Sequence, residues 1–270
     1  MTSIIHWILH INQIRPDVLQ HIRTALELDG IGYDEVKIIP FADALPPVRY
    51  PDRFNVFYGS ATLIMNVARN RRLSGGVFYD PERFNIANYL RHWGPRMLNH
   101  DSRVTTFPAF ATRLHDEDSE WFLRPNEGNK AFDGTVMRFS DIQKLAAELD
   151  IFNNPNLGPD TQIVVSSPKS ITREWRHFIV NGKVISSSRY ARNGDPDVAG
   201  WDVPEDLLAF VEECCEIYTP HDIFVMDTAF CNGRYAIIEC NCFNCTGFYE
   251  HDIVLVVRTI NEYLRERTSV

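Results

Sequence analysis

The sequence predicts an α/β unit over residues 1–100, followed by an α+β unit with antiparallel sheets over residues 101–270. The length of 270 residues suffices for two domains of ordinary size, each with its own core. Strand and helix patterns alternate in the first hundred residues, which is typical of a parallel, doubly wound sheet. Hairpins interleaved with helices follow, and they indicate antiparallel sheet covered on one face. We place the boundary near Gly94 and Pro95.

Apolar, β-branched runs predict the strands of the first unit, and amphipathic spacing predicts its helices. The expected strands cover residues 3–9, 35–41, 55–58 and 76–79. The expected helices cover residues 17–28, 61–70 and 81–93, the last with Pro81 at its start. No G-x-G-x-x-G fingerprint follows the first strand, so a dinucleotide-binding fold is not supported.

Two Asn-Gly pairs organise the second unit, because Asn-Gly between apolar runs is the strongest short hairpin pattern. The expected hairpins are 174–180 with 183–190 and 223–230 with 234–241. Further strands are expected over residues 121–124 and 162–165. The expected helices cover 140–149, with Ser140 as N-cap, 205–218 and 249–265.

The charge and the apolar pattern exclude some classes of function. A formal net charge of -9 argues against a nucleic-acid surface, because phosphate binding normally needs a basic excess. A local basic pocket for a phosphorylated ligand remains compatible with that charge. No run approaches the roughly 18 to 20 apolar residues of a membrane span, and the N-terminus lacks the features of a signal peptide. We therefore expect a cytoplasmic protein with reduced thiols and no membrane or nucleic-acid partner.

The first hairpin predicts a polar face. With a strict two-residue turn, paired residue numbers sum to 363, so Glu174 lies opposite Arg189 and Arg176 opposite Ser187. Two arginines and a carboxylate on one face could grip an anion and one of its hydroxyls. The alternative is a solvated face with a cross-strand ion pair worth about 0.2–1 kcal/mol.

The second hairpin carries acceptors inside strongly apolar strands. Asp227, Glu239 and Asn241 interrupt these strands, where an isolated charge is costly to bury. Glu239 and Asn241 share a face. A two-residue turn would put Asp227 on the opposite face, and a three-residue loop would put all three together. Together they would form a hard oxygen site suited to magnesium. The alternative is two unrelated polar breaks at strand ends.

The segment 124–134 combines two cations with two glycines. Arg124 and Lys130 supply the charge, while Gly128 and Gly134 let backbone N–H groups approach a phosphate closely. The Walker pattern is absent. By itself the segment also fits an ordinary surface loop.

Taken in order, these motifs resemble those of the ATP-grasp superfamily, most closely its small bacterial and phage proteins. The resemblance covers the chain from about Asp101 to the C-terminus, and the preceding α/β unit would be a pre-ATP-grasp domain. The motifs are F-L-R-P ending at Pro125, I-V-V-S-S-P ending at Pro168, E-W-R at 174–176, S-R-Y at 188–190, M-D-T at 226–228 and E-C-N at 239–241.

The resemblance implies an ATP- and magnesium-dependent ligase that joins a carboxylate to an amine through an acyl phosphate. Its substrates would be small molecules or peptides, and a homodimer is compatible with it. Two positions depart from the usual pattern, Arg124 where lysine is common and Cys242 where proline is frequent. The implied roles are phosphate binding for Arg124 and Lys130, adenine contact through the backbone for Val165 and Ser167, ribose contact for Glu174, catalysis for Arg176 and Arg189, and metal binding for Asp227, Glu239 and Asn241.

Two other functions compete with the ligase. One is a non-catalytic nucleotide-binding module with the same fold. The other is a zinc or iron–sulfur protein that uses Cys231, Cys240, Cys242 and Cys245. Against the latter, Cys240 and Cys242 should point away from Glu239 into apolar surroundings, and Cys-x-Cys lacks the common knuckle spacing.

Overall fold

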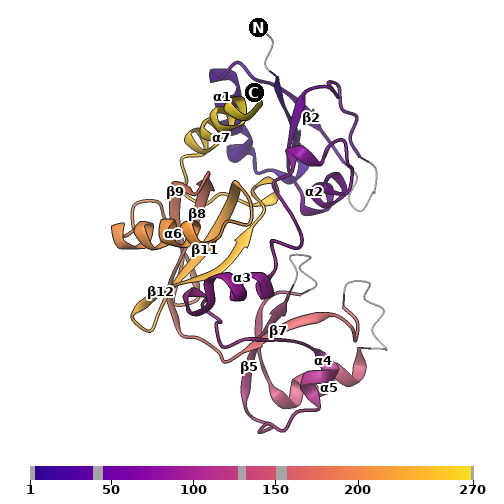
Figure 1. Ribbon diagram of the computed structural model, residues 1–270, viewed down its shortest axis with the longest axis vertical. Helices are drawn as coiled ribbons and strands as arrows, with labels where there is room; N and C mark the ends of the chain where they lie inside the picture. The colour runs from indigo at the N-terminus through magenta and orange to yellow at the C-terminus, as the bar shows by residue number, and fades with distance from the viewer. Residues whose placement is uncertain (1–3, 39–44, 127–131, 150–156, 269–270) are drawn as a thin grey trace.

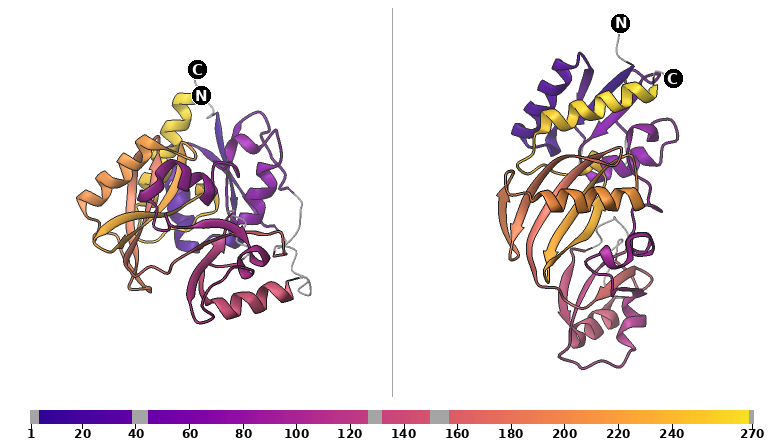
Figure 2. Two further views of the ribbon diagram at one scale, coloured as in Figure 1. Left: turned by 60° about the horizontal axis from the view of Figure 1, so that its bottom comes forward. Right: turned by 60° about the vertical axis from the view of Figure 1, so that its left-hand side comes forward.

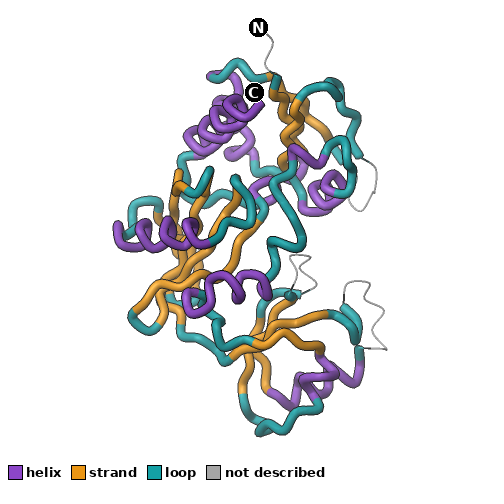
Figure 3. The backbone as a smooth tube through the Cα atoms, in the orientation of Figure 1, coloured by secondary structure: helices purple, strands orange, loops and turns teal. Residues whose placement is uncertain are grey.

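The computed structural model describes residues 4–38, 45–126, 132–149 and 157–268. Three sheets follow one another along the long axis of the molecule (Figures 1 and 3). The N-terminal sheet and the C-terminal helix share one end. A five-stranded sheet occupies the middle, and a four-stranded sheet forms the other end.

The N-terminal sheet is parallel, as predicted, with strand order β2-β1-β3. Its strands are β1 (Ile5–His10), β2 (Gly32–Val36) and β3 (Phe54–Tyr58), and its helices are α1 (Pro16–Leu28), α2 (Ala61–Ala68) and α3 (Ile86–Trp93). The α3 helix starts later than predicted: Asn85 caps its N-terminus, and Pro81 lies in the turn before it.

The expected fourth strand over residues 76–79 is wrong. Residues 74–76 form a short 3-10 helix, and the chain then runs along β3 without a ladder. The fully buried side chain of Asn244 takes the place of the ladder. It accepts from the backbone N–H of Phe78 at 2.7 Å and donates to the carbonyl oxygens of Phe57 (2.6 Å) and Gly76 (2.9 Å). A distant asparagine therefore satisfies backbone groups that a strand partner would otherwise satisfy.

The middle sheet has the strand order β10-β9-β8-β11-β12, and all its pairs are antiparallel. Its strands are β8 (Ile171–Val180), β9 (Lys183–Arg192), β10 (Asp195–Ala199), β11 (Ile223–Cys231) and β12 (Arg234–Asn241). Helix α6 (Glu205–Ile217) covers one face (Figure 2). Helix α7 (Ile253–Thr268) starts four residues later than predicted and packs beside α1 (Figure 2). One apolar core thus joins β1, α1, β8, β11 and α7, and the predicted boundary near residue 100 stays a prediction.

The third sheet, with order β4-β7-β5-β6, has a core of its own. Its elements are β4 (Arg103–Thr106), α4 (Phe107–Ala111), β5 (Glu120–Pro125), β6 (Thr135–Arg138), α5 (Phe139–Glu148) and β7 (Gln162–Ser166). The predicted N-cap at Ser140 is wrong, because α5 follows β6 directly. The first helical N–H groups, those of Phe139 and Ser140, donate to the carbonyl oxygens of Ser119 and Glu117 instead.

Both Asn-Gly turns form as predicted, with positive φ at all four residues: 50° and 76° at Asn181 and Gly182, 51° and 77° at Asn232 and Gly233. The predicted pairing of the first hairpin is wrong. Bulges near Phe178 and Glu174 each shift the register by one residue. As a result Arg176 lies opposite Ser188, Arg189 lies opposite Trp175, and Glu174 lies opposite Ala191.

Candidate functional site

A bulge in the second hairpin brings Asp227 opposite Glu239. The turn has two residues, and Thr228 pairs with Ile237; one residue further on, the register shifts and Asp227 pairs with Glu239. The face that the turn alone would have separated is thereby assembled in mid-strand. The amide Nδ2 of Asn241 completes the group, 3.1 Å from Asp227 Oδ2 and 3.2 Å from Glu239 Oε1.

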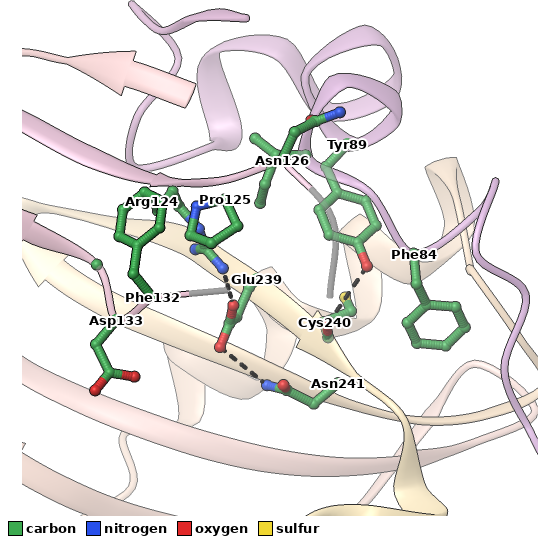
Figure 4. Close-up of a pocket in the computed structure, with 12 residues that line it drawn as sticks. Phe84, Tyr89, Arg124, Pro125, Asn126, Phe132, Asp133, Glu239, Cys240 and Asn241 are labelled. Atoms are coloured by element: carbon green, nitrogen blue, oxygen red, sulfur yellow. Dashed lines mark hydrogen bonds and ion pairs between the residues drawn. The ribbon is translucent and has the colours of Figure 1, made fainter. Parts of the chain in front are cut away.

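Arg124, at the end of β5, reaches Glu239 across the gap between the third and middle sheets. Its guanidinium donates to Glu239 Oε2 (Figure 4), and both side chains are largely buried. The Arg124 Nε is buried and has no hydrogen-bond partner among the described residues. Arg124, Glu239 and Asn241 line a cavity of about 170 Å³ together with Asp133 and Gly134. A buried guanidinium nitrogen without an acceptor at a cavity wall indicates an anionic ligand.

Arg176 lies on the same face and holds Asp227 in a two-pronged ion pair. Its Nε and Nη2 donate to the two carboxylate oxygens at 2.8 and 2.7 Å, and its Nη1 donates to the carbonyl of Gly247 at 3.1 Å. Burial alone would lower the pKa of Arg176, but the Asp227 carboxylate outweighs it, and the net shift is upward. The guanidinium carbon also lies 5.0 Å from the ring centre of Tyr249 and 5.9 Å from that of Tyr190.

Glu174 is tied to this group through Tyr190. The Tyr190 hydroxyl donates to Glu174 Oε2 at 2.9 Å, and the Tyr190 ring stacks on Tyr249 at 5.0 Å. Burial raises the pKa of Glu174, Tyr190 partly offsets that rise, and the nearby Asp227 charge adds to it. Glu174, Arg176 and Asp227 therefore form one electrostatically coupled cluster.

The remaining predicted residues lie elsewhere. The placement of Arg189 beside Arg176 is wrong: it is 3 % exposed on the other side of β9 and pairs with Asp197 and Asp202. Val165 is buried between β4 and β5, and Ser167 donates through N–H and hydroxyl to Asp101. Val165 and Ser167 are not among the described residues that line the Arg124 cavity. Lys130 and Gly128 lie outside the described residues.

Two further cavities continue from the first toward the N-terminal unit. Asn241 and Cys240 line the first cavity and also a second one of about 110 Å³. Arg176 lines that second cavity and a third one of about 380 Å³. The third is walled on its far side by Arg15 and Gly59 of the N-terminal unit, beyond the carboxyl ends of β1 and β3, where open α/β sheets bind ligands.

Sequence reasoning missed several residues that shape the site. Asn126 accepts from the backbone N–H groups of Ile86 and Ala87 and so fixes the start of α3 beside the Arg124 cavity. Tyr89 of α3 donates to the Cys240 carbonyl at 3.4 Å (Figure 4). Tyr249 lies in the loop before α7, where the sequence predicts helix. Of these, only Asn126, next to a proline at a strand end, carried a local sequence pattern that could have marked it.

The cysteines are thiols distributed over separate cores. Cys240 packs with the α6 core, Cys242 and Cys245 with the α2 core, and Cys231 with a small cluster near the second turn. Burial raises the pKa of Cys240 and of Cys242, which disfavours the thiolate that metals bind. Among the described residues, no three His, Cys, Asp or Glu side chains are placed to hold a metal.

Asp227, Glu239 and Asn241 fit a magnesium ion by the chemistry of their donors. Oxygens of both carboxylates lie within hydrogen-bond distance of one atom of Asn241, so the three side chains converge on one point. Carboxylate and amide oxygens are ligands that magnesium accepts, usually together with phosphate oxygens and water. The cavity beside Arg124 leaves room for such phosphates.

Comparison with known proteins gives one family and one fold. The family described as ATP-grasp domain, family 2 of its clade, matches residues 101–258. A search of curated protein sequences finds no match. Similar solved structures include a RimK domain ATP-grasp protein from Sphaerobacter thermophilus (13 % identity, 96 % of this chain and 98 % of that chain, TM-score 0.65). They also include the D-cycloserine synthetase DcsG (15 %, 97 % and 99 %, 0.60) and D-alanine–D-alanine ligase from Bacillus anthracis (13 %, 99 % and 99 %, 0.57). No helix among the described residues is long and apolar enough to span a bilayer.

Proposed function

The chain belongs to the ATP-grasp family, and from that premise we propose that it is an ATP- and magnesium-dependent ligase joining a carboxylate to an amine. The observation that carries the proposal is the convergence of Arg124, Arg176, Asp227, Glu239 and Asn241 on a line of connected cavities. Cations, carboxylates and an amide in one cleft suit a polyphosphate with its metal better than they suit any neutral ligand.

The nucleotide would lie between the third and middle sheets. Arg124 would bind phosphate oxygens, with Lys130 as a second cation, and the glycine at 134 leaves room for them. Its position is tight: a Cβ there would meet the Phe122 ring at 2.8 Å. Val165 and Ser167 are proposed at the adenine edge, and Glu174 at the ribose. Asp227, Glu239 and Asn241 would hold magnesium, which neutralises charge on the phosphoryl group.

Arg176 would act where phosphate and acid meet. It lines both the cavity beside Asn241 and the cavity bounded by the N-terminal unit, so its guanidinium faces each side. Its bidentate pair with Asp227 and its aromatic neighbours hold it in place before substrate arrives. A fixed cation stabilises charge that develops during transfer without reorganising first.

The chemistry follows from these parts. A carboxylate oxygen would attack the γ-phosphorus of ATP, which breaks the bond to the bridging oxygen and releases ADP. The acyl phosphate has a good leaving group, and an amine nitrogen would displace phosphate from its carbonyl carbon. No protein nucleophile is needed. Relatives point to the range of acceptors: PsnB has been crystallised with a precursor peptide, and DcsG is a D-cycloserine synthetase.

A crystal grown with a non-hydrolysable ATP analogue and magnesium tests the assignment. We expect phosphate density beside Arg124 and metal density at Asp227, Glu239 and Asn241. Density anywhere else would overturn the site. Release of ADP on a panel of acid–amine mixtures then tests catalysis. A thermal shift with ATP and magnesium, without ADP release on any mixture, would favour the non-catalytic module instead.

A further inference from the structure

A second charged cavity lies on the other face of the middle sheet. It measures about 610 Å³ and is lined by Arg96, Arg173 and Arg234 together with the aromatic rings of Phe230 and Tyr235. None of these residues belongs to the nucleotide cleft described above.

The two sites are separated by the sheet itself. Arg173 precedes Trp175 by two residues, so both side chains leave β8 on the same face, and Trp175 is buried in the core beneath α6. Arg176 shares its face with Phe178, which is buried in the core joined to α1 and α7. A ligand in one cavity therefore cannot touch the residues of the other.

Arg173 is held by aromatic rings rather than by a carboxylate. Its guanidinium carbon lies 5.6 Å from the Trp175 ring centre and 5.5 Å from that of Phe230. Arg234 donates to the carbonyl of Pro95 at 2.7 Å. Neither they nor Arg96 form an ion pair with any carboxylate among the described residues.

The one acidic side chain in the described lining of this cavity is already engaged. Asp206 Oδ1 accepts from the Tyr235 hydroxyl at 2.9 Å and from the Leu207 N–H at 3.1 Å. The chain as a whole has 36 acidic residues against 27 Lys and Arg, and the buried arginines 124, 176 and 189 all face carboxylates. Three arginines around one cavity without a paired carboxylate are therefore a local excess of positive charge.

We propose that this cavity binds an oxyanion, a phosphate or a carboxylate, carried on a flat apolar group. The guanidinium groups of Arg96, Arg173 and Arg234 would hold the oxyanion, because their planar forks match its oxygens. The rings of Phe230 and Tyr235 would pack against the apolar part. The site stands apart from the ligase proposal, since neither Arg124 nor any metal-binding residue contributes to it.

The test uses phenyl phosphate and benzoate as probes, titrated by calorimetry into the full chain at constant ionic strength. The Arg124→Gln background removes competition from the nucleotide cleft. We expect saturable binding of at least one probe, and the tighter probe identifies phosphate or carboxylate as the preferred oxyanion. Arg173→Gln and Arg234→Gln should each raise its Kd at least tenfold, whereas Arg113→Gln, an exposed arginine of the third-sheet unit, should leave it unchanged.

Absence of saturable binding by both probes would overturn the proposal, as would equal Kd values in all three variants. Backbone amide shifts of residues 173 and 234 on titration provide a measurement that does not depend on the variants folding. Shifts confined to the Arg124 cleft would also overturn it. Because the readout is binding, a chain without ligase activity would still give the expected result.

Discussion

The two hairpins of the middle sheet begin alike and end differently. Both turn at Asn-Gly with positive φ at both residues, and both pair in strict two-residue register next to the turn. In β8–β9 two bulges then move Arg189 off the face of Arg176. In β11–β12 a single bulge moves Glu239 onto the face of Asp227.

The difference teaches that the turn fixes the register only as far as the first bulge. A one-residue shift changes which side chains lie opposite one another and re-aims them. In the first hairpin the shift leaves Tyr190, rather than Arg189, bonded to Glu174. In the second it assembles the proposed metal site. The function assigned to each residue thus depends on where the bulges lie.

The largest expected effect is loss of turnover on removing the carboxylates of the second hairpin. Asp227→Ala and Glu239→Ala should each lower ATP-dependent ligation by at least a thousandfold, because each removes a proposed magnesium ligand. Their stabilities should differ. Asp227→Ala leaves the buried Arg176 unpaired, which costs about 3–5 kcal/mol of unfolding free energy.

Glu239→Ala should cost about 1–2 kcal/mol, because both Glu239 and Arg124 are partly exposed to water. Urea unfolding of both variants measures the contrast, and Glu239→Gln serves as the isosteric control. Turnover by Glu239→Ala at the wild-type rate would contradict its role at the metal.

The second effect separates Arg189 from the site. Arg189→Met should lower the free energy of unfolding by about 2–4 kcal/mol, because Asp197 and Asp202 lose their buried partner. Affinity for ATP and magnesium should stay within about twofold of wild type, since Arg189 does not share the face of Arg176. Chemical denaturation and nucleotide titration give the two numbers. A large loss of nucleotide affinity in a variant that remains folded would restore the sequence-based role of Arg189.

The sequence predicted the parallel and antiparallel units, both turns and the order of the motifs, because these depend on local patterns. It could not decide whether Asp227 and Glu239 share a face, since Ile237 and Ile238 show no sign of a bulge between them. Asn244 was equally hidden: its three bonds to the N-terminal unit join residues more than 160 positions apart. Contacts of that range follow from packing and leave no periodic pattern.

The third effect is a dependence of stability on pH that originates at the floor of the first hairpin. Burial lowers the pKa of His177 to about 3, while its ring nitrogens bond Ser187 at 2.7 Å and Thr228 at 2.8 Å. Between pH 6.5 and 3 the unfolded chain binds a proton at this histidine and the folded chain does not, so stability falls as the pH falls.

The contribution of His177 is complete above pH 6.5, and its loss approaches about 1.4 kcal/mol per pH unit within that window. His177→Gln should flatten the slope of unfolding free energy between pH 6 and 5 by about that amount. Denaturant titrations at several pH values measure it. An unchanged slope would mean that His177 is protonated in the folded chain.

The smallest effect tests the residue that the bulges brought into the site. Tyr190→Phe removes the hydroxyl that stabilises the ionised form of Glu174, so the pKa of Glu174, already raised by burial, should rise further by about one unit. A carboxyl titration of Glu174 by NMR measures the shift. Tyr249→Phe is the matched control, because it keeps a ring over Arg176 and leaves the bond between Tyr190 and Glu174 intact. Equal titration midpoints in Tyr190→Phe and wild type would show that Glu174 takes its ionisation from Arg176 alone, and the second bulge of β8–β9 would then have no electrostatic consequence for the site.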